Sequence, residues 1–198
     1  MLSFRTVTPD TLELLKALMS APELSSLRLV GGTALALQYG HRVSVDLDLF
    51  GEVTIDKFEL LSLLQGLGEV RVINETKNIH QYFVNGIKVD IVNYPYSWID
   101  APVEDDSIRL ASPKDIAALK INAIEGRGTK KDFIDMYLLL QHYSLEEILT
   151  FYQQKYPDYS IFRALRSLTY FDDANDQIMP QMFVEDTSVI PSIFYTCT

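Results

Sequence analysis

The sequence of 198 residues contains one cysteine, Cys197, and three histidines. A single cysteine cannot form an intrachain disulfide, and His41, His80 and His142 are too widely spaced to suggest a zinc site with it. The N-terminus lacks the apolar stretch of a secretory signal, so a reducing cytoplasm is the expected location. No run approaches the roughly 18 apolar residues of a membrane helix, and we expect no membrane partner.

Basic residues are scarce as well. There are 17 lysines and arginines against 27 aspartates and glutamates, which gives a formal net charge of −10. This balance argues against a protein that binds nucleic acid through its overall charge. Local basic surfaces are still expected, and the candidates are Arg127 with Lys130 and Lys131, and Arg163 with Arg166.

The hydrophobic pattern changes midway along the chain, and it contains no internal repeat. Helix and strand patterns alternate in the first half, whereas only helical patterns follow. We therefore predict an α+β fold, with a small mixed sheet flanked by helices (residues 1–98) and a helical region packed on it (residues 99–176). Residues 177–198 contain two prolines and no clear period, and they are predicted as an irregular tail. The whole could count as one domain.

Aspartates interrupt two strand patterns. In HRVSVDLDLFG (residues 41–51) apolar and polar positions alternate, which puts Asp46 and Asp48 on one face, about 7 Å apart. An Asn-Gly turn predicts a hairpin further on, and Asp90 lies within its second strand, where aspartate is disfavoured. Taken alone, two aspartates such as Asp46 and Asp48 on one face of a strand are more often simply exposed to solvent than part of a metal site. If the two strands pair, three carboxylates converge and need a cation, for which oxygen ligands favour Mg²⁺ or Mn²⁺.

A glycine pair precedes the acidic strand. Gly31 and Gly32 end a short strand and lead into a helix, where free backbone N–H groups can bind an anion such as a triphosphate. Thr33 can add a hydroxyl donor or cap the helix. Alone, two glycines would indicate a tight turn. Mg²⁺ held by carboxylates usually completes its shell with substrate phosphates, which indicates phosphoryl or nucleotidyl transfer.

Together these motifs resemble the DNA polymerase β-like nucleotidyltransferase superfamily. The shared order is a hydrophobic residue, Gly-Gly, thirteen residues and Asp-hydrophobic-Asp-hydrophobic, here Val30-Gly31-Gly32 and Asp46-Leu47-Asp48-Leu49. The resemblance implies a minimal nucleotidyltransferase fold. It also implies that the two acids, with a third acid on a later strand, bind two divalent metals, and Asp90 matches the third position.

Charged residues also interrupt the helical half. Lys120 falls within an apolar helical stripe, where it either snorkels to solvent or faces the sheet. Asp132 and Asp135 lie three residues apart at the start of the next helix. A solvated first turn, favoured by the helix dipole, is the structural alternative for both acids.

Residues 112–140, joined to the glycine and aspartate motifs, closely resemble the AbiEii/AbiGii-type nucleotidyltransferases. That family includes toxin components of bacterial toxin–antitoxin and phage-defence systems. The resemblance extends over roughly residues 28–140. It implies that Lys120, Arg127 and one of the two acids, Asp132 or Asp135, belong to the active site.

The implied reaction is Mg²⁺-dependent transfer of a nucleoside monophosphate from an NTP to a hydroxyl acceptor, such as tRNA or another macromolecule. A cognate antitoxin would be a partner. The residues expected to act are the metal ligands Asp46, Asp48 and Asp90, the triphosphate cradle Gly31, Gly32 and Thr33, and the charge-balancing Lys120. Two alternatives stay open: an inactive relative that binds a nucleotide or a partner protein, and a small-molecule, antibiotic-type nucleotidyltransferase.

Overall fold

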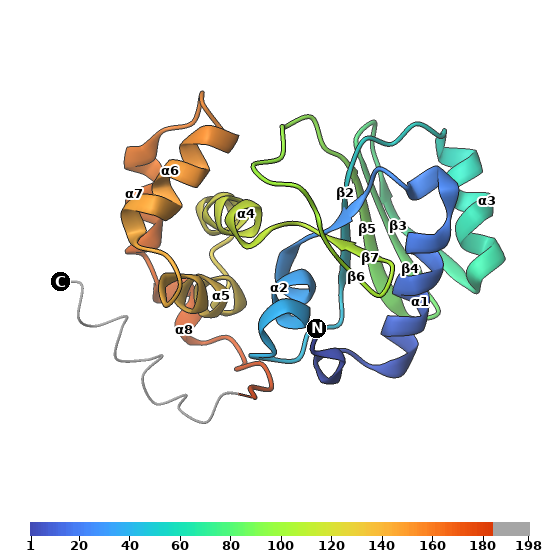
Figure 1. Cartoon of the computed structure of the whole chain (residues 1–198), viewed down its shortest axis with the longest axis horizontal. Helices are drawn as coiled ribbons and strands as arrows, with labels where there is room; N and C mark the ends of the chain where they lie inside the picture. The colour runs from blue at the N-terminus through green and yellow to red at the C-terminus, as the bar shows by residue number, and fades with distance from the viewer. Residues whose placement is uncertain (184–198) are drawn as a thin grey trace. The chain divides into compact units, whose positions relative to one another are not determined.

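The computed structural model describes residues 1–183, apart from the side chains of residues 172 and 173 (Figure 1). The chain divides into two compact units, and we describe each by itself. Unit 1 comprises Met1–Gly40, Ser44–Pro95 and Pro102–Ala111, and unit 2 comprises His41–Val43, Tyr96–Ala101 and Ser112 onward. Most of the predicted irregular tail, residues 184–198, lies outside the described residues.

Unit 1 contains a mixed, seven-stranded sheet in the order β3-β4-β5-β2-β1-β7-β6. Strand β2 runs parallel to β5, and β1 runs parallel to β7, whereas the other neighbours are antiparallel. The sheet confirms the predicted α+β class. The strands are β1 (Arg28–Leu29), β2 (Leu47–Gly51), β3 (Val70–Glu75), β4 (Ile79–Val84), β5 (Ile87–Asn93), β6 (Val103–Asp105) and β7 (Ile108–Leu110).

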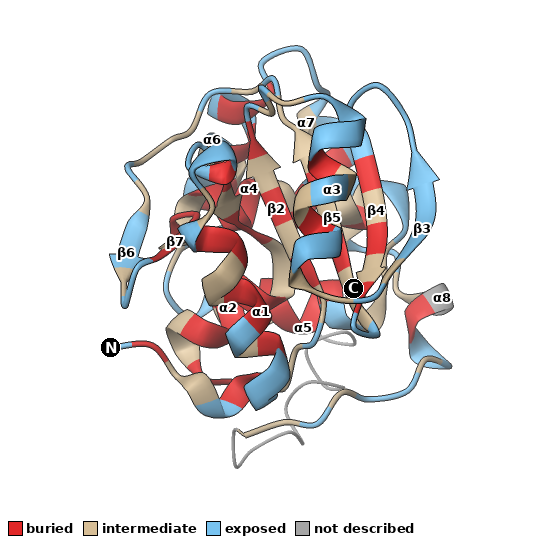
Figure 2. Ribbon diagram, turned by 90° about the vertical axis from the view of Figure 1, so that its right-hand side faces the viewer, coloured by how far each residue is buried: buried red, intermediate tan, exposed pale blue. Residues whose placement is uncertain are grey.

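Three α-helices pack on this sheet, α1 (Pro9–Ser20), α2 (Gly31–Tyr39) and α3 (Lys57–Leu67). Helices α1 and α3 lie on one face and α2 on the other (Figure 1). Helix α1 begins at Pro9, because the Thr8 side chain accepts a hydrogen bond from the Thr11 N–H and proline suits the first turn. Figure 2 shows buried residues alternating with half-buried ones along β2 and β5, whereas β3 is exposed.

The strand predicted over residues 41–51 is wrong in its first half. Strand β2 begins only at Leu47, and Val45 is 44% exposed. Residues 41–43 belong to unit 2, where Val43 N–H donates to the Gln181 carbonyl and Arg42 forms an isolated bridge with Met182. The alternating pattern therefore joins two segments with different backbone partners.

The segment that follows β5 contains a further hairpin, β6–β7. Its strands have three residues each, too short to show a period. Asp106 and Ser107 form the turn with positive φ angles of 50° and 63°. Aspartate and serine are common turn residues, but strands this short leave no recognisable pattern in the sequence.

Unit 2 is helical, with α4 (Pro113–Gly126), α5 (Lys130–Leu140), α6 (Leu145–Lys155), α7 (Ile161–Leu168) and α8 (Asp172–Asn175). Helix α4 contacts α5, α6 and α7. It begins after Ser112, which caps the helix because its hydroxyl accepts a hydrogen bond from the Asp115 N–H. No helix in residues 1–183 is both long and apolar enough to cross a membrane.

A buried ion pair ties α6 to α4. The Lys155 ammonium lies 2.7 Å from the Asp115 carboxylate, and both side chains are fully buried. Lys155 also donates to the Ser97 carbonyl and lies 4.5 Å from the ring centre of Trp98, and Asp115 accepts a bond from the Ile99 N–H. The pair therefore anchors the segment Tyr96–Ala101 within unit 2.

Candidate active site

The two neighbouring strands of unit 1 carry the acidic residues that we singled out. The parallel register of β2 and β5 pairs Asp48 directly with Asp90. Leu47, Leu49 and their partners in β5 are buried, so both aspartates lie on the opposite, half-buried side of these strands. Neighbouring strands are about 4.8 Å apart, which brings the two carboxylates side by side.

Asp90 has one oxygen in use and one unsatisfied. Its Oδ2 accepts hydrogen bonds from Lys88 Nζ at 2.7 Å and from Gln81 Nε2 at 2.9 Å. Its Oδ1 is buried and has no hydrogen-bond partner in the described part of the chain. A buried carboxylate oxygen without a partner is costly, so this atom is a natural position for a bound cation or a hydroxyl donor.

Gly31 brings the start of helix α2 against Asp48. Its φ angle of 69° is in the left-handed region, and a Cβ placed on it would lie 2.5 Å from Asp48 Oδ2. A side chain is therefore excluded for two reasons, backbone strain and collision with the carboxylate. Gly32 follows in the first helical turn, where the N–H groups lack partners within the helix.

Thr33 has a different contact from either of those predicted. No side chain caps α2, which is preceded by Val30. The buried Thr33 hydroxyl instead donates to the Asp46 carbonyl at 2.5 Å and lies 2.8 Å from the Ser44 hydroxyl. Thr33 thus holds the backbone of Asp46, which immediately precedes β2 and is half-buried.

The donor set in unit 1 fits a hard divalent cation in its chemistry. Asp46, Asp48 and Asp90 offer only carboxylate oxygens, which Mg²⁺ and Mn²⁺ prefer. The unsatisfied oxygen of Asp90 and the glycine that makes room beside Asp48 support such a ligand. Among the side chains that the structure describes, however, no three acidic, histidine or cysteine residues form a ready-made metal cluster.

The predicted residues of unit 2 form a charge cluster in which Lys120, Asp132 and Asp135 are buried, whereas the Arg127 side chain is 66% exposed. The Asp132 carboxylate accepts hydrogen bonds from Lys120 Nζ at 3.0 Å, from Arg127 Nε at 3.1 Å and from the Thr129 hydroxyl. Burial alone would raise the pKa of Asp132. The Lys120 charge and the bonds from Arg127 and Thr129 outweigh burial and lower this pKa to about 2.

Asp135 is the second carboxylate of this cluster, and it is fully buried. Arg42 binds both of its oxygens, with Nε at 2.7 Å and Nη2 at 2.8 Å, while His41 Nε2 lies 2.9 Å away and Lys120 Nζ 2.5 Å away. Burial favours the neutral acid, but Lys120 and Arg42 hold the pKa of Asp135 far below its usual range. This carboxylate is ionised at neutral pH.

The sequence left the choice between Asp132 and Asp135 open, and the structure brings both to Lys120. Neither acid lies in a solvated first turn, and the Lys120 ammonium does not reach solvent, because all three side chains are at most 6% exposed. The contribution of His41 and Arg42 was missed. They lie within a pattern read as a strand, and nothing in that pattern connects them to a helix more than 90 residues later.

Comparisons with known proteins place this geometry in context. The chain is 32% identical over 180 residues to the protein aq_aa25 of Aquifex aeolicus (strain VF5), covering 88% of this chain and 87% of the relative. The crystal structure of ANT(2")-Ia in complex with adenylyl-2"-tobramycin is similar with a TM-score of 0.60 and 18% identity, over 77% of this chain and all of that one. JHP933 from Helicobacter pylori is similar with a TM-score of 0.50 and 18% identity, over 82% and 90% of the two chains. At these identities the two structures support the fold alone.

The family match is more extensive. Residues 13–182 match the family described as nucleotidyl transferase AbiEii toxin, type IV toxin–antitoxin system. This range includes the glycine pair, the paired aspartates of the sheet and the buried charge cluster of α4 and α5. The chain therefore belongs to the AbiEii family of nucleotidyltransferase toxins.

Proposed function

We propose that this chain is a Mg²⁺- or Mn²⁺-dependent enzyme that transfers a nucleoside monophosphate from an NTP to a hydroxyl acceptor. Membership of the AbiEii family supports a nucleotidyltransferase of the toxin type. The acceptor that we favour is RNA, and the partner that we expect is a cognate antitoxin protein. The dependence on metal, the base of the NTP and the acceptor are parts of this proposal.

One observation carries the proposal. Asp48 and Asp90 are paired across parallel strands, and the glycine that begins α2 lies against Asp48. Carboxylates that favour a cation and N–H groups that favour a phosphate thus meet at one end of a helix. A metal-bound triphosphate satisfies both groups, whereas either ligand alone satisfies only one.

Different residues of unit 1 would bind the triphosphate and the metal ions. The N–H groups of Gly31 and Gly32 would bind the triphosphate, and Thr33 would hold the Asp46 backbone in position. Asp46 and Asp48 would hold the cations. The free oxygen of Asp90 would complete the metal site near the attacking hydroxyl and accept its hydrogen bond. When bound, the metal would stabilise charge on the attacking and leaving oxygens.

On family grounds we retain Lys120, Arg127, Asp132 and Asp135 as active-site residues. Ion pairs join these four residues in unit 2, and the buried charges of Lys120, Asp132 and Asp135 hold one another in a single position. Lys120 would also balance part of the triphosphate charge, as the family resemblance implies. This role requires Lys120 to share its charge with the two aspartates that now bind it.

The test is incubation with each NTP, labelled at the α-phosphate, together with Mg²⁺ and total cellular RNA. We expect label in RNA with the unchanged protein and none with Asp46→Asn. The matched control is Asp10→Asn, which removes an exposed charge in unit 1. Equal labelling by the unchanged protein and Asp46→Asn would refute the proposed catalytic site.

The same experiment separates the alternatives. An inactive relative would give a higher melting temperature with NTP and Mg²⁺ but no label in any product. A small-molecule enzyme would label a low-molecular-weight alcohol in the absence of RNA. For the toxin role, expression of the unchanged protein should arrest growth, whereas expression of Asp46→Asn should not.

A further inference from the structure

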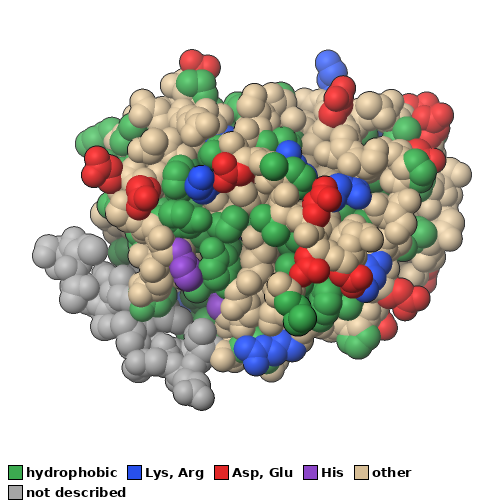
Figure 3. Space-filling view, viewed as in Figure 1, with side chains coloured by type: hydrophobic (Ala, Val, Ile, Leu, Met, Phe, Trp, Pro, Cys, Tyr) green, Lys and Arg blue, Asp and Glu red, His purple; other side chains and the backbone are tan. Residues whose placement is uncertain are grey.

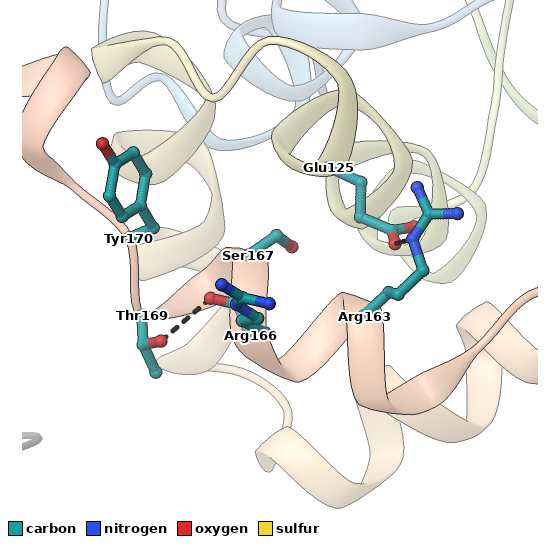
Figure 4. A pocket seen from close by; sticks show the side chains of 6 residues that line it. All are labelled: Glu125, Arg163, Arg166, Ser167, Thr169 and Tyr170. Atoms are coloured by element: carbon teal, nitrogen blue, oxygen red, sulfur yellow. Dashed lines mark hydrogen bonds and ion pairs between the residues drawn. The ribbon is translucent and has the colours of Figure 1, made fainter.

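A second candidate site lies in unit 2, and none of its lining residues belongs to the charge cluster of Lys120, Arg127, Asp132 and Asp135. It is a pocket of about 450 Å³ between α4 and the end of α7 (Figure 4). Two guanidinium groups and an aromatic ring reach it from one short stretch of chain. The lining residues are Glu125, Arg163, Arg166, Ser167, Thr169 and Tyr170.

The pocket is cationic in an acidic protein. On the face shown in Figure 3, single lysines and arginines are interspersed with acids, and the described residues form no broad basic area there. Arg163 and Arg166 lie three residues apart on α7, so their side chains share one side of the helix. Two positive charges on one helical turn are therefore a local departure from the net charge of −10.

The carboxylate in the pocket does not cancel these charges. Glu125 is only 9% exposed at its side chain, and it accepts a hydrogen bond from the Tyr152 hydroxyl. Its nearest contact with Arg163 is 3.6 Å, longer than a good hydrogen bond, and Arg163 is 76% exposed. Arg166 is exposed, and the structure records no ion pair with it among the side chains that it describes, which leave out those of residues 172, 173 and 184–198. Arg166 and the outer face of Arg163 are thus available to an anion.

Aromatic and apolar side chains accompany the arginines. Tyr170 is 58% exposed, and Phe162, next to Arg163 on α7, is 73% exposed. Ala164 is the residue of this helix that is fully buried. A short helix that buries an alanine and presents a phenylalanine and two arginines to solvent is poorly explained by packing alone. Exposed rings next to arginines are typical of surfaces that bind unpaired bases.

We infer that this pocket binds a single-stranded polynucleotide, with a backbone phosphate at Arg163 and Arg166 and a base stacked on Tyr170. The inference deepens the proposed function, because it names the class of acceptor. Ser167 and Thr169 contribute little to phosphate binding, since their hydroxyls donate to the carbonyls of Ala164 and Arg166. Recognition therefore depends on the two guanidiniums and the ring.

A polymer fits this surface better than a free phosphate or a mononucleotide. Both arginines are exposed, and salt screens an exposed ion pair to a small net gain. A polynucleotide adds neighbouring phosphates and a stacked base to the same contact. A duplex keeps its bases stacked on one another, so a single strand is the form that can use Tyr170.

Binding is measured by fluorescence anisotropy on the full chain, with a labelled oligoadenylate about 12 nucleotides long, the size range of single-strand sites. NTP is left out and EDTA is added, so that the proposed metal site does not contribute. We expect Arg163→Gln/Arg166→Gln to weaken binding by about ten-fold or more and to lower the slope of log K against log salt by about 1.4, for two phosphate contacts. Tyr170→Leu should weaken binding by about five-fold or more.

The matched control is Arg71→Gln/Lys77→Gln, which removes two exposed charges from unit 1 and should leave the affinity unchanged. Melting temperatures verify that all variants fold. The same measurements with DNA of equal sequence decide which polynucleotide is bound, and both should bind more tightly than a duplex. Equal affinity of the unchanged protein and the Arg163→Gln/Arg166→Gln variant, or tighter binding of the duplex, would overturn the inference.

Failure of this inference can be told from failure of the proposed function. If RNA is labelled equally well by the unchanged protein and by Arg163→Gln/Arg166→Gln, and the variant binds oligoadenylate normally, the pocket is not the acceptor site and the transferase proposal stands. If the variant loses binding but no NTP labels RNA, the pocket binds polynucleotide and the transferase proposal fails.

Discussion

Removing the charge of Asp135 is the sharpest test of the buried cluster in unit 2. The carboxylate is fully buried, and it faces two cationic side chains, Arg42 and Lys120, that are almost fully buried themselves. Asp132 is the second buried anion. Two buried cations are therefore matched by two buried anions, and Asp135→Asn leaves one positive charge without compensation.

The expected cost follows from this imbalance. Breaking a buried ion pair by removing one partner typically costs about 3–5 kcal/mol, because the remaining charge stays in a low-dielectric setting. Asp135 also accepts two short bonds from Arg42, and an asparagine can accept only at its single oxygen. We therefore expect a loss of about 4 kcal/mol in the free energy of unfolding. Domains are usually stable by about 5–15 kcal/mol, so the variant should be close to unfolding.

Urea unfolding at pH 7, followed by circular dichroism, measures this loss. The matched control is Asp100→Asn, which removes one carboxylate from the exposed Asp100–Lys114 pair at 3.2 Å. Exposed pairs contribute about 0–1 kcal/mol, so the control should be nearly neutral. A loss below about 1 kcal/mol in Asp135→Asn would mean that Arg42 and Lys120 find other partners or reach water, and the reasoning would be refuted.

Three further predictions concern single contacts. Gly31→Ala should destabilise the protein by about 1–3 kcal/mol and abolish the rise in melting temperature with NTP and Mg²⁺, because its Cβ collides with Asp48; an unchanged rise would contradict the cradle. The pKa of Asp132 is about 2 in the folded state against 3.8 ordinarily, so its ionised form adds about 2 kcal/mol to the free energy of unfolding above pH 4. This contribution is lost as the pH falls to 2, and Asp132→Asn should therefore flatten that part of the curve of stability against pH. Lys155→Met should cost about 3–5 kcal/mol, and Lys155→Met/Asp115→Asn should cost less than the sum of the single changes.

The elements that the sequence predicted well are those whose signals are local. Thr8 and Ser112 cap their helices by contacts within three residues, so such caps are visible in the sequence itself. The Asn85-Gly86 turn likewise has positive φ angles of 51° and 80°, which these two residue types tolerate. Predictions that needed only one turn of chain were therefore reliable.

The predictions were wrong where the hydrogen-bond partners of a segment lie far away in the sequence. Residues 41–43 alternate like a strand, but their partners are residues 181–183, which no local pattern reveals. For the same reason Arg42 was not connected with Asp135. The pairing of Asp48 with Asp90 was predictable only as a condition, since the alternation indicates which side chains share a face but not which strands are neighbours.

The carboxylates of the two units differ in how fully their charge is matched, and this difference gives a last prediction. Both carboxylate oxygens of Asp135 accept hydrogen bonds. In Asp90, one oxygen accepts bonds from a lysine and a glutamine, and the other is buried with no partner found among the described residues. A site that must bind a ligand keeps groups unsatisfied until the ligand arrives, at some cost in stability.

Asp90→Asn should therefore change the free energy of unfolding by less than about 1 kcal/mol, because only a partly exposed ion pair with Lys88 is lost. Transfer of label to RNA should nevertheless be abolished. Parallel urea unfolding and transfer assays on Asp90→Asn and Asp135→Asn compare the two carboxylates directly. If Asp90→Asn lost as much stability as Asp135→Asn, then Asp90 would be a structural residue, and the ligand site proposed for unit 1 would lose its third carboxylate.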